Sequence, residues 1–265
     1  MPFISASAIS PYNKIRSGGA SGPTPPPIFS FGNALKFDGV NDYVSFPDEP
    51  LFEGRTTLTI SLWAKIPFVG GDFQVGSRPS STDVFIISRT SSNSNGIVLV
   101  NRASGSGAGS YQTYDSTKFD LYDQWAHLVV VYDAANPFQT RLKLYINGVY
   151  TGYNYIAPQA STVMGDIDGS FEIGAVTALG AYTDGEINEV GIWHGILSDE
   201  EIVGLYNNGF GDFATNYQPD ILKRYYRFNG SGDDSTLIDE GLDGVDGTLN
   251  GFTRPPEYWV EGQRP

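Results

Sequence analysis

Acidic and histidine side chains are the residues of this chain that could perform chemistry, and their spacing does not favour catalysis. Hydrolysis of a glycosidic bond with retention needs two carboxylates about 5 Å apart. Glu186 and Glu189 are three residues apart, so a regular strand would point them to opposite faces. A nucleophilic triad needs a histidine base, and the chain has two histidines and no Gly-x-Ser-x-Gly elbow. His127 lies in an apolar segment and is expected to be packed and hydrogen-bonded, whereas His194 is expected to be exposed.

Oxygen ligands for a hard cation are a second candidate. Asp38, Asn41 and Asp42 crowd one turn-rich loop. Calcium binds clustered carboxylate and carbonyl oxygens from flexible loops. Asp and Asn in turns also hydrogen-bond to the nearby backbone, which would make the same residues purely structural. The residue types fit both interpretations.

Tyrosines in the expected loops could stack on the faces of sugar rings, while neighbouring Asn, Asp or Gln side chains bond the hydroxyl groups. The candidates are Tyr111, Tyr114, Tyr153, Tyr155 and Tyr182. Each of them could instead pack against the protein or lie in an interface between subunits, where tyrosine is enriched.

The charge of the chain is unevenly distributed. Its net charge of −14 disfavours binding to nucleic acid and to anionic membranes. Residues 1–37 hold no acidic residue but contain Lys14, Arg16 and Lys36, so residues 38–265 carry 13 basic and 30 acidic residues. A basic arm on an acidic body could dock on an acidic neighbour, including another copy of the chain. A solvated tail with incidental charges fits equally well.

Residues 1–30 are predicted to form an extended arm, because their Gly- and Pro-rich stretch cannot pack a core. The first residues lack the positive leading region of a signal peptide, so none is expected. No apolar run approaches the roughly 20 residues needed to span a bilayer. The absence of cysteine excludes disulfides and thiolate metal sites.

From residue 31 onward, the pattern is one of short strands separated by turns. Residues 57–66 alternate between polar and apolar, and residues 125–133 are apolar on both faces, which predicts a central strand covered on both sides. Asn147-Gly148 predicts a tight hairpin turn. Further strands are expected at residues 34–37, 43–46, 84–89, 97–101, 141–146, 149–150, 171–174, 186–193 and 222–228. About ten to twelve strands indicate two packed sheets.

One helix is predicted in the middle of these strands. Ser198 and Glu201 have the spacing of a capping box, and Gly209 can end the helix in the left-handed conformation. This short helix is expected to close an edge of the sandwich. Its buried stripe would consist of Ile202, Val203, Leu205 and Tyr206.

The order of these segments resembles the laminin-G-like, concanavalin A-like jelly rolls. The segments that carry the resemblance are Ala34–Val44, Thr59–Lys65, Trp125–Asp133, Leu144–Gly148, and Gly185–Trp193 with Leu197–Tyr206. The tail is similar to the Tyr-x-Phe-Asn-Gly … Asp … Gly-Thr-Leu segment that accompanies such domains, at Tyr225–Gly230, Asp239 and Gly247–Gly251. We therefore expect an all-β, two-sheet antiparallel jelly-roll sandwich over residues 31–265, with residues 220–265 as its closing strands.

The resemblance also has implications for the sites. It brings the loop of Asp38 and Asp42 near the strand of Glu189, which implies a structural calcium ion at these three residues. Asn188 stands where the family has an aspartate, which lowers the charge of such a site. The Glu-x-Asp-x-Glu and Glu-x-Asp-x-x-Glu patterns of the related glucanases are absent from the chain.

The arm and the resemblance together predict a non-enzymatic binding module. Similar modules occur in bacteriophage virion proteins, so a virion surface protein is expected, either a capsid decoration or a fibre protein. Its arm, with Lys14 and Arg16, would anchor it to other virion proteins or to copies of itself. The alternatives are a free carbohydrate-binding adhesin, outside the cell or on its surface, and a glucanase-like hydrolase.

Overall fold

The two longest strand patterns of the sequence form adjacent central strands. Strands β3 (Thr57–Lys65) and β8 (Trp125–Asp133) pair antiparallel along their whole length. In β3, Leu58, Ile60 and Leu62 face the sandwich core, as the alternation predicts. β-Branched and aromatic residues make up half of these two strands, and these residue types fit a pleated, buried surface.

The computed structural model describes the chain in segments. These are residues 32–47, 50–67, 73–77, 84–89, 97–102, 110–114, 123–137, 140–152, 155–156, 164, 171–230, 234–253 and 258–262. The predicted N-terminal arm, including Lys14 and Arg16, lies outside the described residues.

Within these segments, eight strands form the first sheet, here called sheet A. Its order is β10-β9-β8-β3-β15-β1-β19, and β16 also pairs with β15. Besides β3 and β8, the strands are β1 (Asn33–Asp38), β9 (Leu142–Ile146), β10 (Val149–Tyr150), β15 (Asp184–Trp193), β16 (Leu222–Tyr226) and β19 (Trp259–Glu261).

The second sheet, sheet B, contains nine described strands in the order β11-β7-β6-β5-β4-β12-β2-β18-β17. They are β2 (Tyr43–Ser45), β4 (Phe73–Ser77), β5 (Val84–Arg89), β6 (Ile97–Arg102), β7 (Ser110–Tyr114), β11 (Tyr155–Ile156), β12 (Glu172–Ile173), β17 (Thr236–Leu237) and β18 (Gly247–Asn250). A separate small hairpin pairs β13 (Ala175–Val176) with β14 (Ala181–Tyr182). The predicted fold class, an all-β antiparallel sandwich with one short helix, is confirmed.

Sheet A is buried on both faces. Leu128, Val130 and Tyr132 of β8 pack into the core between the two sheets. Val129 and Val131 point the other way, into a second apolar cluster. The prediction that residues 125–133 form a strand covered on both sides is therefore confirmed. Burying a side chain of this size is worth about 1.5–3 kcal/mol.

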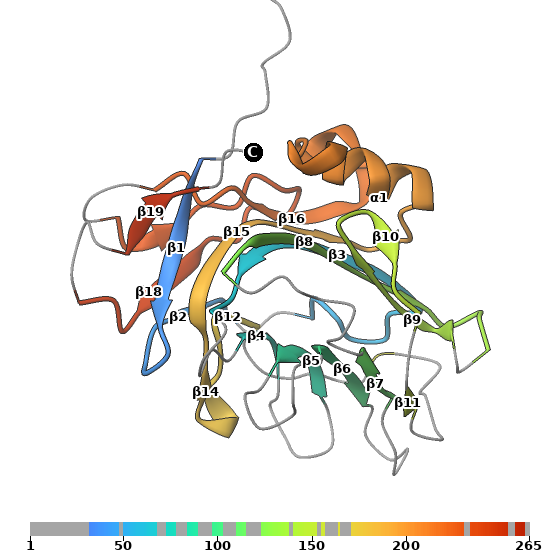
Figure 1. Ribbon diagram of the computed structural model, residues 1–265, viewed down its shortest axis with the longest axis horizontal. Coiled ribbons are helices and arrows are strands. Elements are labelled where there is room, and N and C mark those ends of the chain that lie inside the picture. The colour runs from blue at the N-terminus through green and yellow to red at the C-terminus, as the bar shows by residue number, and fades with distance from the viewer. Residues whose placement is uncertain are drawn as a thin grey trace, which may run out of the picture.

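The second cluster lies under the helix α1 (Asp199–Tyr206) and two 3₁₀ turns (Ala214–Asn216 and Pro219–Ile221). A further 3₁₀ turn, Asn207–Gly209, follows α1 directly. Figure 1 shows α1 above β16, β15 and β8, on the side of sheet A opposite to sheet B. Trp193 is fully buried here and donates its indole N–H to the carbonyl oxygen of Tyr217 at 2.8 Å. The helix thus covers a face of a sheet, and the expectation that it closes an edge is wrong.

The ends of α1 follow from local side-chain chemistry. Ser198 Oγ accepts a hydrogen bond from the Glu201 N–H, and the Glu201 carboxylate accepts one from the Ser198 N–H, so the predicted capping box is present. The helix ends at Asn207, which adopts the left-handed conformation, and not at Gly209 as predicted. Val203 is 52% exposed, so the predicted buried stripe is narrower than expected.

The Asn147-Gly148 turn is also confirmed. Both residues have positive φ, 51° and 76°, and Val149 pairs with Ile146 across the turn. Such angles define the tight hairpin turn that matches the twist of the strands. In the described part of the chain, no helix is long and apolar enough to cross a membrane.

The Ser198→Ala variant should have a free energy of unfolding about 1 kcal/mol lower than the wild type, because one backbone N–H at the start of α1 loses its partner. Urea unfolding measures the difference. Val203→Ala, at an exposed position of the same helix, is the matched control and should change stability by less than about 0.5 kcal/mol. Equal stabilities of Ser198→Ala and the wild type would contradict a contribution from the cap.

Candidate functional site

The last part of the chain joins the two sheets along one side of the sandwich. After β16 on sheet A, the chain forms β17 and β18 on sheet B and then returns to sheet A as β19. Strand β18 pairs with β2, and β19 pairs with β1. Figure 1 shows β1, β2, β18 and β19 gathered at this side. The first and last strands of the described chain therefore meet there.

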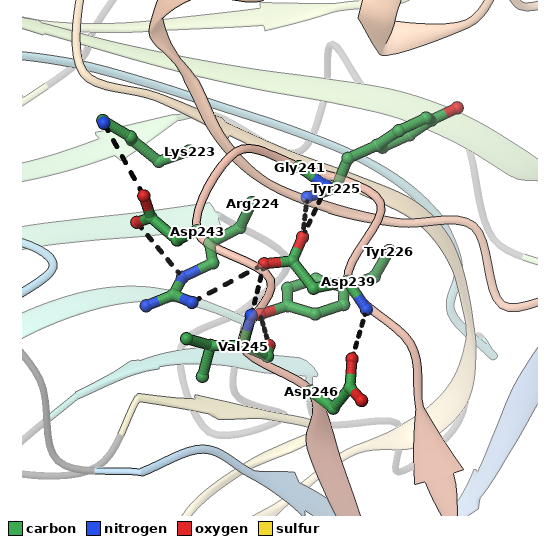
Figure 2. A network of polar contacts seen from close by, with 9 residues as sticks. All are labelled: Lys223, Arg224, Tyr225, Tyr226, Asp239, Gly241, Asp243, Val245 and Asp246. Carbon is green, nitrogen blue, oxygen red and sulfur yellow. Dashed lines mark hydrogen bonds and ion pairs between the residues drawn. The ribbon is translucent and has the colours of Figure 1, made fainter.

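A buried carboxylate holds the turn between β17 and β18 in place (Figure 2). Asp239 accepts backbone N–H groups from Tyr225 and Gly241 on one oxygen and from Val245 on the other, at 2.8–2.9 Å. Arg224 lies 3.6 Å from the second oxygen. Because these bonds occupy both oxygens of a fully buried carboxylate, Asp239 organises the chain and is not free for a ligand.

Further polar contacts tie the same turn to β16. The Tyr226 hydroxyl donates to the Val245 carbonyl oxygen at 2.9 Å, and Asp246 accepts the Asp239 N–H at 2.9 Å. Asp243 forms ion pairs with Lys223 and Arg224 at 3.6 and 3.8 Å (Figure 2). The acidic residues of this turn are thus used to fix its shape.

A cavity of about 340 Å³ opens where β1 meets the returning chain. We call it the Asp42 pocket. Its walls combine aromatic rings with charged side chains, a composition typical of sites for small polar ligands. The lining residues are Lys36, Phe37, Asp38, Asp42, Phe252, Thr253 and Tyr258.

The aromatic wall of this pocket is built by close ring packing. The Phe252 ring lies 5.1 Å from that of Tyr258 and 5.5 Å from that of Phe37, measured between centroids. Gly251 makes this approach possible: its φ is +85°, and a Cβ there would lie 2.2 Å from the Asn41 carbonyl oxygen. A larger residue would push Phe252 away from the 38–42 turn.

The two carboxylates of the pocket sit on this turn. Asp38 accepts the N–H groups of Val40 and Asn41 at 2.8 and 3.1 Å, and Asp42 accepts the Asp38 N–H at 3.1 Å. Asp42 is 6% exposed. Its burial, followed by the nearby charge of Asp38, raises its pKa to about 6, although the bond from the Asp38 N–H opposes the rise.

The predicted calcium ligands do not form one site. The register pairs Asp38 with Asp184 and Leu35 with Ile187, so Glu189 lies about five residues, or roughly 16 Å, further along the sheet than Asp38. Among the described residues, no group of three or more His, Asp or Glu side chains is close enough to hold a metal ion. A single ion held by Asp38, Asp42 and Glu189 is thus wrong on geometric grounds.

Glu189 lies at a β-bulge on the outer face of sheet A. Strand β15 has one more residue than β3 between Asn188 and Gly191, and Glu189 has a φ of 50°. Its carboxyl group accepts the Tyr225 hydroxyl and lies 3.7 Å from the Arg227 guanidinium. Burial raises its pKa to about 8, even though both partners favour the charged form.

The bulge also overturns the expectation that Glu186 and Glu189 face opposite sides. Glu186 pairs with Lys65 at 3.3 Å on the outer face, and Tyr225, the partner of Glu189, belongs to the apolar cluster of the same face. The extra residue reverses the alternation on which the expectation depended. Each of the two carboxylates has a cation beside it, Lys65 for Glu186 and Arg227 for Glu189. Glu189 is also almost completely buried.

Both histidines are structural. His127 is bonded to Ser61 Oγ at 2.7 Å and stacks on the ring of Trp63, and its burial lowers its pKa to about 3. This confirms the packed imidazole predicted for it. His194 is half-buried and bonded to the Leu51 carbonyl oxygen at 2.8 Å, so its predicted exposure is wrong.

The structure places three of the predicted tyrosines in two adjacent strands and a fourth in a separate hairpin. Tyr111 and Tyr114 lie in β7 and Tyr155 in the adjacent β11, so these three are in strands and not in loops as expected. Their side chains and the whole of Tyr153 are outside the described residues. Tyr182 lies in β14, at the other end of the molecule from β11 in Figure 1, with its ring 6.5 Å from that of Tyr43. The prediction that these residues stack on sugars stays a prediction.

Phe252, Thr253 and Tyr258 were not found by sequence reasoning, although Asp38 and Asp42 were. The pairing of β1 with β19 brings together residues more than 200 positions apart. The local signal was Gly251, at the end of a Gly-Thr-Leu-Asn-Gly segment, where a glycine allows two backbone segments to approach closely.

The comparisons with known proteins concern the jelly-roll body. A laminin G-type family model, described as "Concanavalin A-like lectin/glucanases superfamily", matches residues 38–203. This confirms the resemblance predicted from the sequence. Comparison with curated protein sequences gave no match.

Several solved structures are similar to this chain. A proposed carbohydrate-binding protein from Bacteroides ovatus has a TM-score of 0.54 at 17% identity, over 86% of this chain and 62% of that chain. At this identity the similarity shows a shared fold, and the chain spans less than two thirds of that protein.

Two further similar structures have TM-scores below 0.5. A heptameric SAP-like pentraxin from Limulus polyphemus has a TM-score of 0.47 at 17% identity, over 68% of this chain and 84% of that chain. The carbohydrate-binding module CBM40 of a Ruminococcus gnavus sialidase also has a TM-score of 0.47, at 13% identity, over 68% of this chain and 98% of that chain.

Replacing Asp42 by Asn should stabilise the protein at neutral pH. The folded-state pKa of about 6 lies above the ordinary value of 3.8. Between these values the folded protein binds more protons at Asp42 than the unfolded chain does, so the free energy of unfolding falls as the pH rises. The neutral amide side chain in Asp42→Asn would remove this fall in the free energy of unfolding. Its oxygen can still accept the Asp38 N–H. We expect a gain of about 1 kcal/mol at about pH 7.5 that disappears towards about pH 4.

Denaturant unfolding at a series of pH values tests this prediction. Glu53→Gln, which removes an exposed carboxylate, is the control and should show no comparable change between these pH values. A variant that is less stable than the wild type at neutral pH would show that the Asp42 charge is favourable in the folded state.

Proposed function

The chain belongs to the concanavalin A-like lectin/glucanase superfamily, and we propose from this premise and from the Asp42 pocket that it is a non-enzymatic, carbohydrate-binding module. The observation that carries the proposal is the pairing of aromatic rings with carboxylates in one cavity at the side of the sandwich. The family supports a binding module in general, and this cavity supports a sugar as its ligand.

Sugar rings need two kinds of contact, and the Asp42 pocket offers both. Their C–H faces pack on aromatic rings, and the partly exposed ring of Phe252, supported by Tyr258 at 5.1 Å between centroids, supplies one. Their hydroxyl groups donate hydrogen bonds to carboxylates, which Asp38 and Asp42 supply, and accept them from groups such as the Lys36 ammonium. The volume of about 340 Å³ falls within the range of small-ligand sites, about 300–1,000 Å³.

Charge narrows the class of glycan. Two carboxylates and one ammonium line the pocket, and Asp184 lies directly opposite Asp38 in the strand pairing. The whole chain carries −14. An acidic sugar would be repelled by this field, so the pocket favours neutral or amino sugars.

The position of the carboxylates favours binding over hydrolysis. Asp38 and Asp42 lie on one turn and bond to the N–H groups of that turn. Catalytic carboxyl groups of glycosidases flank the scissile bond from two sides. A glucanase-like activity remains the second candidate, because a raised pKa on one of two neighbouring carboxylates is also the mark of an acid catalyst.

The purified protein should bind neutral or amino-sugar glycans on an array that also carries acidic glycans. Phe252→Leu keeps apolar volume but removes the ring, so its affinity should be about tenfold lower, corresponding to about 1.4 kcal/mol. Titration calorimetry with the strongest array glycan measures the change. Phe210→Leu, at a ring that is 60% exposed and outside the pocket, is the matched control and should bind like the wild type.

Two outcomes would contradict the proposal. Equal affinities of Phe252→Leu and Phe210→Leu would place binding elsewhere on the protein. Release of reducing ends from the bound glycan, lost in Asp42→Asn, would make the protein a hydrolase.

A more specific proposal concerns where the module is displayed. The basic arm and the acidic body support attachment of residues 1–30 to a shell, with the sandwich exposed on a virion surface. An extracellular or cell-surface protein is the alternative.

Antibodies against the sandwich should label the surface of bacteriophage particles prepared from the organism that encodes the chain. The variant Lys14→Glu/Arg16→Glu should reduce the amount of protein recovered with these particles about tenfold. Lys143→Glu, at a partly exposed position of the body, is the control for the single variant Lys14→Glu and should have the smaller effect of the two. Absence of the protein from such particles would contradict a virion role and favour a free or cell-surface adhesin.

A further inference from the structure

A second cavity, of about 480 Å³, lies beside the chain that leaves β16. We call it the Arg227 pocket. We propose that it is a second binding site for the same glycan chain, so that the protein binds an extended oligosaccharide across two adjoining pockets and not a single terminal sugar. This inference rests on the proposed function of the Asp42 pocket.

Tyr258 joins the two cavities. Its ring lines the Asp42 pocket, and its hydroxyl group is bonded to the carbonyl oxygen of Asp234 at 3.4 Å. Asp234 in turn lines the Arg227 pocket. The walls of the two pockets are therefore joined by one side chain. In the proposal, the sugar chain runs from the first pocket to the second beside Tyr258.

The chemistry of the Arg227 pocket suits the hydroxyl groups of a sugar. Its polar lining supplies donors and acceptors together, and each sugar hydroxyl can both donate and accept a hydrogen bond. Phe228 and Leu237 form an apolar floor and are almost completely buried. The polar groups are Arg227, Asn229, Asp234, Ser235, Thr236 and Glu240.

The two pockets would divide the work of recognition. The Asp42 pocket has the partly exposed ring of Phe252 for stacking, whereas Phe228, the aromatic residue at the Arg227 pocket, is 1% exposed and cannot present its face to a ligand. The first pocket would therefore stack on one ring, and the second would bind the next units through hydrogen bonds.

Arg227 is held in place before any ligand binds. Its guanidinium lies 3.7 Å from the buried Glu189 carboxyl group and 4.6 Å from the centre of the Phe213 ring. A side chain fixed from two sides loses less conformational entropy when it binds a ligand. The bulge at Glu189 thus serves to position a donor of the pocket.

The chain segment that builds the Arg227 pocket lies outside the residues that match the family. The match ends at residue 203, and the lining residues begin at Arg227. The second pocket therefore belongs to the closing segment of this chain and not to the matched jelly-roll body.

Titration calorimetry with the strongest array glycan, prepared as its mono- to hexasaccharide, tests the proposal. In the wild type, the affinity should rise about tenfold or more from the monosaccharide to the trisaccharide, as one or two further hydrogen-bonded units would give. Ser235→Ala/Thr236→Ala removes two hydroxyl groups from exposed positions and should reduce this gain to about twofold or less. Glu240→Gln should reduce it in part and serves as a second variant.

Controls separate this proposal from the proposed function. Thr56→Ala removes an exposed hydroxyl group far from both pockets along the sheet and should keep the full gain with chain length. Phe252→Leu should weaken the binding of every length. If the affinity of the wild type does not rise with oligosaccharide length, or if the rise survives in both pocket variants, the second site is overturned and the first site stands. Failure of all lengths to bind, or binding unaffected by Phe252→Leu, overturns the proposed function itself.

Discussion

Burial of one sheet on both faces is the constraint on which this structure depends. Strands β8 and β15 carry apolar side chains on each side, so sheet A needs two covers. Sheet B provides one cover, and the layer of α1 and the 3₁₀ turns provides the other (Figure 1). A strand of this kind left open to water would expose a large apolar patch. The helix is therefore part of the fold's stability, although it contributes no residue to either pocket.

Strand β15 connects this double burial to the candidate sites. β1 pairs with its first half and β16 with its second half, on the same edge, and the bulge at Asn188–Glu189 lies where the two meet. The chain after β16 can then cross to sheet B and return beside β1. Both pockets form along this path, because a segment that crosses from sheet to sheet cannot fill the side of the sandwich completely.

Three buried carboxylates show how surroundings decide the role of one chemical group. Asp239 has its oxygens occupied by backbone N–H groups and fixes a turn. Glu189 accepts one hydroxyl group and forms an ion pair with Arg227, which it helps to position. Asp42 has a single backbone partner and faces a cavity. The oxygens of Asp42 are thus the ones left available to a ligand, which agrees with the rule that fully bonded buried groups are structural.

The sequence by itself determined the strands, the capped helix, the Asn147-Gly148 turn and the class of fold, because these depend on periodicity and on contacts between near neighbours. It also marked Asp38 and Asp42 as unusual, and the family resemblance then paired them with Glu189. The tertiary structure decided their true neighbours, since one bulge and the return of β19 to β1 set distances between residues some 200 positions apart. No local pattern encodes such a register, because it results from the packing of both sheets at once.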